Sequence, residues 1–437
     1  MDWRERYGYK LRTAEEAAAT VKSGEKIHFG LFQSAPSSLI RALFARREEL
    51  EGVRIHHSVS PFPWAQPGTE KAFRVQSSFV TAADRDALAA GRMDYMPVGY
   101  YQDGFLPAGF EEYDTFMVRV SPPDRHGFCS FGAALWFGRS MAAHSSRVVA
   151  EVDESAIRTG GDNYIHVDQI QILVEKGGND LPIPVPQRSE EDIAVTEVIG
   201  TLVASELVED GDTLQLGFGT VSAAIGAYLG DKHDLGIQTE LIPGGIPTLV
   251  EAGVITGKYK TVHPRKVVGA AFAVLSPEET ALVDGNPTYE LYDFTHTDDL
   301  GMLLKEPRFV AVNNALLVDL GGNVAAESIG ARLWSGAGGQ TLFCLAASYA
   351  RQGRSIIVLP SSSVVQGERR SRIVPVLPEG SQVTAQRAYV DYVVTEHGIA
   401  TLHGKNLKER AGELIAVAHP DFRSELRQAA RRQNLAV

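Results

Sequence analysis

Glu240 is the residue whose neighbours in the sequence most clearly suggest chemistry. It ends an apolar segment and precedes a Gly/Pro-rich turn within residues 235–245 (Leu-Gly-Ile-Gln-Thr-Glu-Leu-Ile-Pro-Gly-Gly). Gly-rich turns also lie upstream, at residues 216–219, and downstream, at residues 335–340. A carboxylate placed where backbone N–H groups converge can act as a nucleophile towards an activated acyl group. The alternative is a surface glutamate at a turn, since most glutamates are solvated.

The elements that must position Glu240 occur twice in the chain. Residues 21–32 and residues 208–219 match in their apolar and glycine positions, and such self-similarity indicates a repeated structural unit. Each block predicts the end of a helix, a Gly turn, a short buried strand and a second Gly-containing turn. Apolar residues at helical spacing then predict helices over residues 36–47 and residues 221–229.

The repeat continues beyond these helices. Residues 52–56 match residues 236–240, so that His56 stands at the position equivalent to Glu240. Residues 116–132 resemble residues 309–330 in outline, since both run from an apolar strand through an Asp/Gly turn to a stretch of small residues. Residues 147–152 and residues 355–359 are further candidates for buried strands. Ligands of open α/β sheets bind beyond the carboxyl ends of the strands, which favours a functional role for Glu240.

Strands that alternate with helices predict parallel sheets covered by helices. We therefore expect two tandem, similar open α/β domains with mostly parallel sheets, over residues 1–180 and residues 190–437. The boundary is predicted within residues 177–186, where two glycines precede three prolines at alternate positions, a pattern typical of an extended linker.

The composition limits the classes of function. The 437 residues carry a formal net charge of −12, which argues against nonspecific binding to nucleic acid. Cys129 and Cys344 are too few for a disulfide framework, so a reducing cytoplasm is expected. The charged N-terminal residues lack a secretory signal, and no segment has the ~20 apolar residues of a membrane helix. We expect a cytoplasmic protein without a membrane partner.

Nine ordered blocks in the sequence carry a resemblance to a known family. They are residues 120–132, 165–168, 236–240, 319–320, 327–330, 335–340, 371–375, 392–398 and 418–423. On these blocks the chain resembles the acetyl-CoA hydrolase/transferase family of class I CoA-transferases, and within it the 4-hydroxybutyrate CoA-transferase-like branch. The resemblance runs nearly from end to end, and the Thr-Glu of the family's nucleophile motif falls on Thr239 and Glu240.

The resemblance implies ping-pong transfer of CoA between an acyl-CoA and a small carboxylic acid. Glu240 would form an acyl-glutamyl anhydride and then a glutamyl-CoA thioester. The ionised carboxylate is expected to need no general base at neutral pH, and no metal is expected. Coenzyme A enters as the acyl-CoA substrate, the 190–437 domain would carry most of its site, and a homodimer or tetramer is implied.

Site residues follow from the resemblance and from the chemistry of each residue type. Oxyanion or substrate contacts are predicted for Gly338, Gly339, Gln340 and His56. Contacts with CoA are predicted for Gly217, Gly219, Gly336, Lys258 and Arg372. The alternatives are glycine turns packed in the core, a structural histidine at a strand end, and basic residues on solvated faces.

The sequence departs from the family's pattern at three places. Residues 243–245 read Pro-Gly-Gly in place of an acidic-glycine turn, and residues 296–300 contain neither the expected Asn nor the expected Pro. Val274 and Leu275 stand where a glycine is expected after Phe272. These changes leave the acyl donor and the acceptor unassigned.

The sequence is also compatible with two other functions. An acyl-CoA hydrolase on the same scaffold would let water intercept the anhydride or the thioester. A noncatalytic CoA- or metabolite-binding protein could keep the fold without the activity. His397, His403 and His419 lack metal-ligand spacing, so no metal site is predicted.

Overall fold

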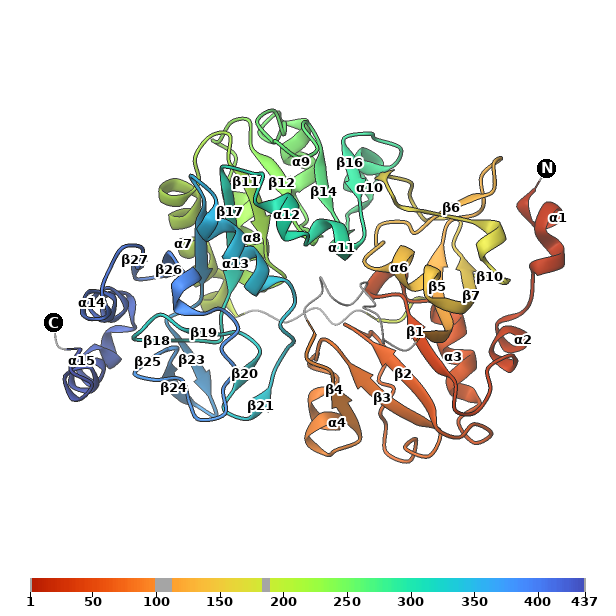
Figure 1. Ribbon diagram of the computed structural model, residues 1–437, viewed down its shortest axis with the longest axis horizontal. Coiled ribbons are helices and arrows are strands. Elements are labelled where there is room, and N and C mark those ends of the chain that lie inside the picture. The colour runs from red at the N-terminus through yellow and green to blue at the C-terminus, as the bar shows by residue number, and fades with distance from the viewer. Residues whose placement is uncertain (1, 99–111, 183–188, 436–437) are drawn as a thin grey trace. The chain divides into compact units, whose positions relative to one another are not determined.

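The computed structural model describes residues 2–98, 112–182 and 189–435, and the chain forms two compact units (Figure 1). Unit 1 consists of Met1–Val185 and the later segment Val268–Thr297. Unit 2 consists of Pro186–Val267 and Asp298–Val437. The proline-rich part of the predicted linker, residues 183–186, lies outside the described residues.

The main sheet of unit 1 has the strand order β10-β7-β5-β1-β2-β3-β4. Its neighbouring strands pair in parallel throughout. The strands are β1 (Lys26–Phe29), β2 (Val53–His57), β3 (Phe73–Ser77), β4 (Met93–Tyr95), β5 (Tyr113–Val120), β7 (Ser145–Val152) and β10 (Ile172–Glu175). Shorter pairs are β6 (Phe128–Ser130) with β9 (Tyr164–His166), and β8 (Gly160–Gly161) with β16 (Tyr289–Leu291).

The helices of unit 1 are short. They are α1 (Trp3–Tyr7), α2 (Ala14–Ala19), α3 (Ser37–Ala45), α4 (Arg85–Ala89), α6 (Gly138–Ala143), α10 (Pro277–Val283) and α11 (Phe294–Thr297). Helix α3 lies within the predicted helix 36–47 and is shorter at both ends, and its Leu39, Ile40 and Leu43 are buried in the same core as Ile27 and Ile55 of the sheet. Burial of each such side chain contributes roughly 1.5–3 kcal/mol.

Unit 2 contains the strand order β27-β26-β22-β17-β11-β12. These strands pair in parallel, except that β27 runs antiparallel to β26. Their bounds are β11 (Thr213–Leu216), β12 (Gly236–Gln238), β17 (Phe309–Asn314), β22 (Arg354–Val358), β26 (Tyr392–Thr395) and β27 (Gly398–Thr401).

Seven α-helices among the described residues accompany this sheet. They are α7 (Glu190–Leu202), α8 (Thr220–Ala224), α9 (Ile246–Glu251), α12 (Leu300–Leu303), α13 (Gln340–Tyr349), α14 (Leu407–Val417) and α15 (Arg423–Arg432). The predicted helix 221–229 is divided between α8 and a 3-10 turn, Ile225–Tyr228. No helix in the described part of the chain is long and apolar enough to cross a membrane.

The remaining strands form small ladders. β18 (Leu317–Asp319) pairs with β19 (Val324–Ala325) and β25 (Ile373–Val374), β20 (Ser328–Ile329) with β21 (Arg332–Leu333), and β23 (Ser362–Val365) with β24 (Glu368–Ser371). Three further short strands are β13 (Leu241–Ile242), β14 (Val267–Gly269) and β15 (Ala271–Phe272).

The repeat seen in the sequence is a repeat of topology. The order β7-β5-β1-β2 of unit 1 recurs in unit 2 as β22-β17-β11-β12. In unit 1, β1 lies between β5 and β2. In unit 2, β11 lies between β17 and β12, and all four of these pairs are parallel. The predicted α/β fold with two similar, mostly parallel open sheets is therefore confirmed.

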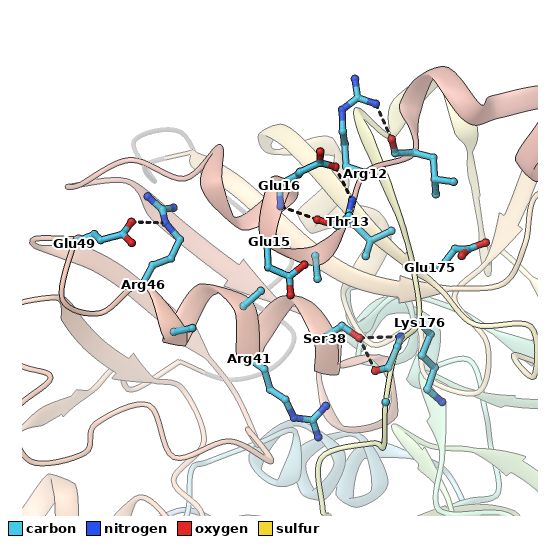
Figure 2. Close-up of a pocket in the computed structure, with 17 residues that line it drawn as sticks. Arg12, Thr13, Glu15, Glu16, Ser38, Arg41, Arg46, Glu49, Glu175 and Lys176 are labelled. Carbon is cyan, nitrogen blue, oxygen red and sulfur yellow. Dashed lines mark hydrogen bonds and ion pairs between the residues drawn. The ribbon is translucent and has the colours of Figure 1, made fainter.

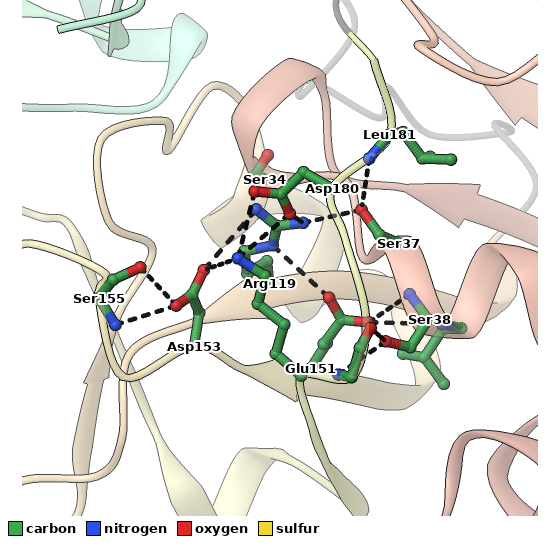
Figure 3. Close-up of polar contacts among 12 residues, drawn as sticks. Ser34, Ser37, Ser38, Arg119, Glu151, Asp153, Ser155, Asp180 and Leu181 are labelled. Carbon is green, nitrogen blue, oxygen red and sulfur yellow. Dashed lines mark hydrogen bonds and ion pairs between the residues drawn. The ribbon is translucent and has the colours of Figure 1, made fainter. Parts of the chain in front are cut away.

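A buried ionic network holds helix α3 against the sheet of unit 1 (Figure 3). Pro36 precedes α3 and offers no side-chain cap. Instead Glu151 of β7, which is fully buried, accepts the N–H of Ser38 at 2.7 Å and lies 3.6 Å from the Arg119 guanidinium. Arg119 also donates to Ser37 Oγ at 2.9 Å. A carboxylate at an uncapped helix start satisfies N–H groups that the helix itself leaves without partners.

Candidate active site

Glu240 lies just beyond the carboxyl end of β12, as the sequence predicted for a ligand-binding position. Thr239 fixes this end to the neighbouring strand β11, because its Oγ1 lies 3.1 Å from the carbonyl oxygen of Leu216. Thr239 is fully buried, and Glu240 is 9% exposed. The reading of Glu240 as a solvated surface acid is thereby wrong.

The start of helix α13 faces Glu240. Gly339 occupies the N-cap position of this ten-residue helix. A Cβ atom at Gly339 would stand only 2.8 Å from Glu240 Oε1 and 2.6 Å from Asp298 Oδ2. A side chain at this position would collide with both carboxyl groups and with the ring of Phe343, so glycine is required for the close approach.

Burial changes the protonation of Glu240. It raises the pKa of Glu240 to about 7, against the opposing influence of the Asp298 side chain and the Gly339 amide. Glu240 Oε1 accepts no hydrogen bond within the described residues. Loss of solvation penalises the ionised form of a buried carboxyl group. A raised pKa of Glu240 is a consequence of burial in the fold that the sequence did not show.

The upstream glycine turn packs against the end of β17. A Cβ at Gly217 would stand 2.6 Å from Asn313 Oδ1, and one at Gly219 would stand 2.0 Å from Asn314 Nδ2. Asn314 Oδ1 accepts the N–H of Ser222 in α8 at 3.3 Å. The two glycines therefore admit the asparagine side chains, and a close turn packed in the fold explains both of them without a ligand.

The downstream glycine turn is joined to the same asparagine. Gln340, the first residue of α13, donates from Nε2 to the carbonyl oxygen of Asn314 at 3.1 Å. Gly338 has a positive φ of 54°, which favours glycine, and Gly336 is buried. The structure thus brings together the turns around Gly217, Gly219 and residues 336–340 with Glu240, at the carboxyl ends of β11, β12 and β17.

The two basic residues predicted to contact CoA have carboxylate neighbours of their own. Lys258 lies 3.2 Å from Asp234, which precedes β12, whereas Glu240 follows that strand. Half-buried Arg372 precedes β25. Burial lowers its pKa, and the charges of Asp192 and Glu396 oppose this shift. No contact within the described residues joins either side chain to Glu240.

Lys260, a neighbour of Lys258 in the sequence, has a structural place in unit 2. It is 4% exposed, and its Nζ donates to the carbonyl oxygens of Ile237 at 2.6 Å and Lys266 at 3.1 Å. These bonds hold the strand that leads to Glu240. Lys260 therefore contributes to the position of the Glu240 carboxylate.

His56 belongs to a buried aromatic cluster in unit 1. Its ring contacts His28 at a centroid distance of 4.8 Å, and its Nδ1 is hydrogen-bonded to the Tyr113 hydroxyl. Burial lowers the pKa of His56 well below its usual value and that of His28 to about 3. Both rings are therefore neutral at pH 7. The predicted role of His56 in an acyl pocket stays a prediction.

A groove lies in unit 1, and none of these predicted residues lines it (Figure 2). Its volume is about 990 Å³, and it runs beside α2, α3 and β10. Its charged lining mixes both signs: Arg12, Arg41, Arg46 and Lys176 with Glu15, Glu16, Glu49 and Glu175. Nothing in this lining reproduces the buried carboxylate and glycine turns of unit 2.

Asp298 is the residue of this region that the sequence did not identify. It is 1% exposed and approaches Gly339 from the segment before α12. The sequence showed only that residues 296–300 depart from the family's pattern. No spacing or motif indicated which of these side chains would face Glu240.

The two cysteines take no part in this site. Cys129 and Cys344 are free and buried. Burial raises the pKa of each thiol to about 12, so neither is an activated nucleophile. In the described part of the chain no group of three or more His, Cys, Asp or Glu side chains could hold a metal ion.

Comparison with known proteins assigns the family. Residues 1–185 match the acetyl-CoA hydrolase/transferase N-terminal domain, and residues 278–430 match the C-terminal domain of the same name. The chain belongs to the acetyl-CoA hydrolase/transferase family. The resemblance seen in the sequence is thereby confirmed.

Named relatives cover nearly the whole chain. It is 38% identical to 4-hydroxybutyrate coenzyme A transferase of Clostridium kluyveri, over 98% of both chains. It is 34% identical to succinyl-CoA:cyclohexane-1-carboxylate CoA transferase of Geobacter metallireducens, over 98% of this chain and 96% of the relative. Among solved structures, RipA from Yersinia pestis superposes with a TM-score of 0.90 at 30% identity over all of both chains.

Proposed function

We propose that the chain is an acyl-CoA:carboxylate CoA-transferase that works through Glu240. Family members of this kind carry the activity in their names, and they match nearly all of the chain. The observation that supports Glu240 in particular is its burial beside the Gly339 amide at the start of α13.

The proposed reaction begins with attack by an ionised Glu240 oxygen on the thioester carbonyl carbon. The new C–O bond replaces the C–S bond, so that CoA leaves as a thiolate and an acyl-glutamyl anhydride remains. The thiolate then attacks the glutamyl carbonyl, which releases the first carboxylic acid and leaves a glutamyl-CoA thioester. An incoming carboxylate reverses these steps and departs as the new acyl-CoA.

Each step passes through an oxyanion, which preorganised N–H donors stabilise. We propose the backbone around Gly338, Gly339 and Gln340 for this role, and His56 for the acyl pocket. For CoA we propose the turns at Gly217, Gly219 and Gly336, together with Lys258 and Arg372. The 190–437 region would carry most of the CoA site.

The identities of the two acids are left to experiment. The relatives are named for 4-hydroxybutyrate, for succinyl-CoA with cyclohexane-1-carboxylate, and for butyryl-CoA with acetate. We expect a small carboxylic acid of this range as acceptor. The family resemblance also leads us to expect a cytoplasmic homo-oligomer, a dimer or tetramer.

The test is mass spectrometry of the whole protein after incubation with a panel of acyl-CoAs. A CoA adduct should form, and an added carboxylate should discharge it. Borohydride should convert the glutamyl thioester to an alcohol, which leaves the peptide that holds Glu240 lighter by one oxygen and heavier by two hydrogens. Glu240→Gln should form no adduct, whereas Glu290→Gln, at a half-buried glutamate of unit 1, should react normally.

Other outcomes would contradict the proposal. Free thiol that accumulates with no adduct and no need for a carboxylate would indicate hydrolysis. Neither adduct nor thiol with any acyl-CoA would favour a noncatalytic binding protein. A Glu240→Gln variant that turns over like the wild type would exclude Glu240 as the nucleophile.

A further inference from the structure

Two acidic side chains converge on one point of the backbone in unit 2. Glu240 reaches Gly339 from the end of β12, and Asp298 reaches it from the segment before α12. The ideal Cβ position of Gly339 is 2.8 Å from Glu240 Oε1 and 2.6 Å from Asp298 Oδ2. Glu240 is 9% exposed and Asp298 is 1% exposed. The pair is therefore close together and shielded from solvent.

Two carboxyl groups in such a place cannot both ionise at low cost. Mutual repulsion and loss of solvation act in the same direction, so a close buried pair retains one proton over a wide pH range. The proton can then form a hydrogen bond between the two groups, with the neutral acid as donor and the carboxylate as acceptor. The question is which of the two carries it.

The surroundings favour Glu240 as the ionised member of the pair. The N–H of Gly339 and the start of α13 face it, and both favour a negative charge. The other α13 group in contact with this position is the apolar ring of Phe343. Within the described residues, Asp298 is the one titratable side chain that acts on the protonation of Glu240. Asp299, its neighbour, is exposed and accepts the N–H of Met302 at 2.7 Å.

We propose that Asp298 carries the shared proton and donates it as a hydrogen bond to the Glu240 carboxylate, so that Asp298 positions the nucleophile and keeps it ionised. This inference rests on the proposed function of Glu240. When Glu240 is acylated it becomes neutral, and it must leave again as a carboxylate. The same donor would stabilise that leaving carboxylate, while the proton stays on Asp298 throughout.

The first test needs no substrate. The side-chain carboxyl carbons of glutamate are labelled with ¹³C, and the Glu240 signal is assigned by its loss in Glu240→Gln. Asp298→Ala should move the midpoint of its titration up by about one pH unit, because the donor is lost. Asp298→Asn should keep it within about half a unit, because the amide still donates. Asp299→Asn should leave the midpoint unchanged.

Two results would overturn the proposal. A downward shift in both Asp298 variants would show that Asp298 is ionised and repels Glu240. An unchanged midpoint in both would show that the two groups do not interact. If Asp298→Ala does not fold, Asp298→Asn alone still distinguishes the proposal from an ionised Asp298, because only the latter predicts a downward shift.

The second test measures CoA transfer against pH. Asp298→Ala should lose about fivefold in rate at pH 7 and recover most of it at pH 9, in step with the shifted titration. Asp298→Asn should stay within about threefold at both pH values. An equal loss at every pH would mean a merely structural role and would overturn the proposal. If the wild type transfers no CoA although the ¹³C shifts occur, the proposed function fails and the proton-sharing pair stands.

Discussion

Unit 1 and unit 2 share a strand order and differ in the chemistry that follows one equivalent strand. In unit 1, β2 ends in His56 and His57, which are 2% exposed. In unit 2, β12 is followed by Glu240, with Asp298 beside the same glycine. The same position of the fold therefore holds neutral bases in one unit and an acid pair in the other.

Burial has opposite consequences for these two groups. It lowers the pKa of His56 and raises that of Glu240, since in both cases it penalises the charged form. A neutral histidine already has the protonation state that burial favours. A buried carboxyl group must ionise before it can act as a nucleophile, so it needs donors such as the Gly339 amide. This need for donors accounts for the glycine, Gly339, that lies against Glu240 in unit 2.

The units also anchor the helix after their first strand differently. The N–H of Ser38 in α3 is accepted by the carboxylate of Glu151 at 2.7 Å. The N–H of Ser222 in α8 is accepted by the neutral amide of Asn314 at 3.3 Å. Unit 1 therefore uses a buried charge with Arg119 as its partner, whereas unit 2 uses an uncharged side chain beside its glycine turn.

Removal of that buried charge is the largest effect we expect on stability. Glu151→Ala should destabilise the protein by about 3–5 kcal/mol, because it leaves the start of α3 without an acceptor and removes one buried carboxylate from the network around Arg119, which keeps Asp153 and Asp180. Denaturant unfolding would measure the loss. Glu48→Ala, at an exposed glutamate after α3, is the control and should cost little. A loss below 1 kcal/mol for Glu151→Ala would mean that the network does not anchor α3.

A side chain at Gly339 should have the largest effect on catalysis short of the loss of Glu240. Gly339→Ala places a Cβ against Glu240, Asp298 and Phe343 and so displaces the nucleophile. We expect the rate of CoA transfer to fall by roughly 10²-fold, the scale expected for a misplacement of about 1 Å. Steady-state kinetics would measure it.

The matched control is Gly226→Ala, where the nearest atom to a new Cβ is Ile246 Cδ1 at 3.5 Å. This variant should keep its activity. Equal losses in the two variants would indicate a general effect of alanine on unit 2, and would break the link between Gly339 and the carboxyl pair.

Much of this arrangement could be predicted from the sequence because it is local or repeated. The apolar and glycine patterns predicted the strands β1, β2, β11 and β12, and the end of β12 predicted the place of Glu240. The raised pKa of Glu240 could not be predicted, because it depends on burial by segments distant in the chain. Asp298 was missed for the same reason, since only the fold brings it to Gly339.

The opposite protonation shifts predict opposite dependences of stability on pH. Glu240 has a folded pKa of about 7 against an unfolded value near 4.5, so its contribution is present below pH 4.5 and is lost as the pH rises to 7. His56 has a lowered folded pKa, so its contribution is present above pH 6.5 and is lost as the pH falls. Burial of Glu240 therefore lowers stability at high pH, whereas burial of His56 lowers it at low pH.

Glu240→Gln should accordingly be more stable than the wild type at pH 8, by on the order of 3 kcal/mol, and similar to it at pH 4.5. His56→Gln should instead flatten the loss of stability below pH 6.5. His233→Gln, at an exposed histidine, is the control for the second variant. Calorimetric scans across pH would measure these slopes, and a Glu240→Gln variant no more stable than wild type at pH 8 would contradict the raised pKa.

The smallest effect is expected at Lys258, which tests how far the CoA site of unit 2 extends from Glu240. Lys258 pairs with Asp234 before β12, and exposed pairs of this kind contribute little to stability. Lys258→Ala should therefore unfold like the wild type and raise the KM for acyl-CoA only about two- to threefold, with no change in the KM for the carboxylate. Lys408→Ala, at an exposed lysine of α14, should change neither. If Lys258→Ala leaves both KM values unchanged at low salt, Lys258 does not bind CoA, and the anionic part of the substrate must be held by groups nearer the carboxyl ends of the strands.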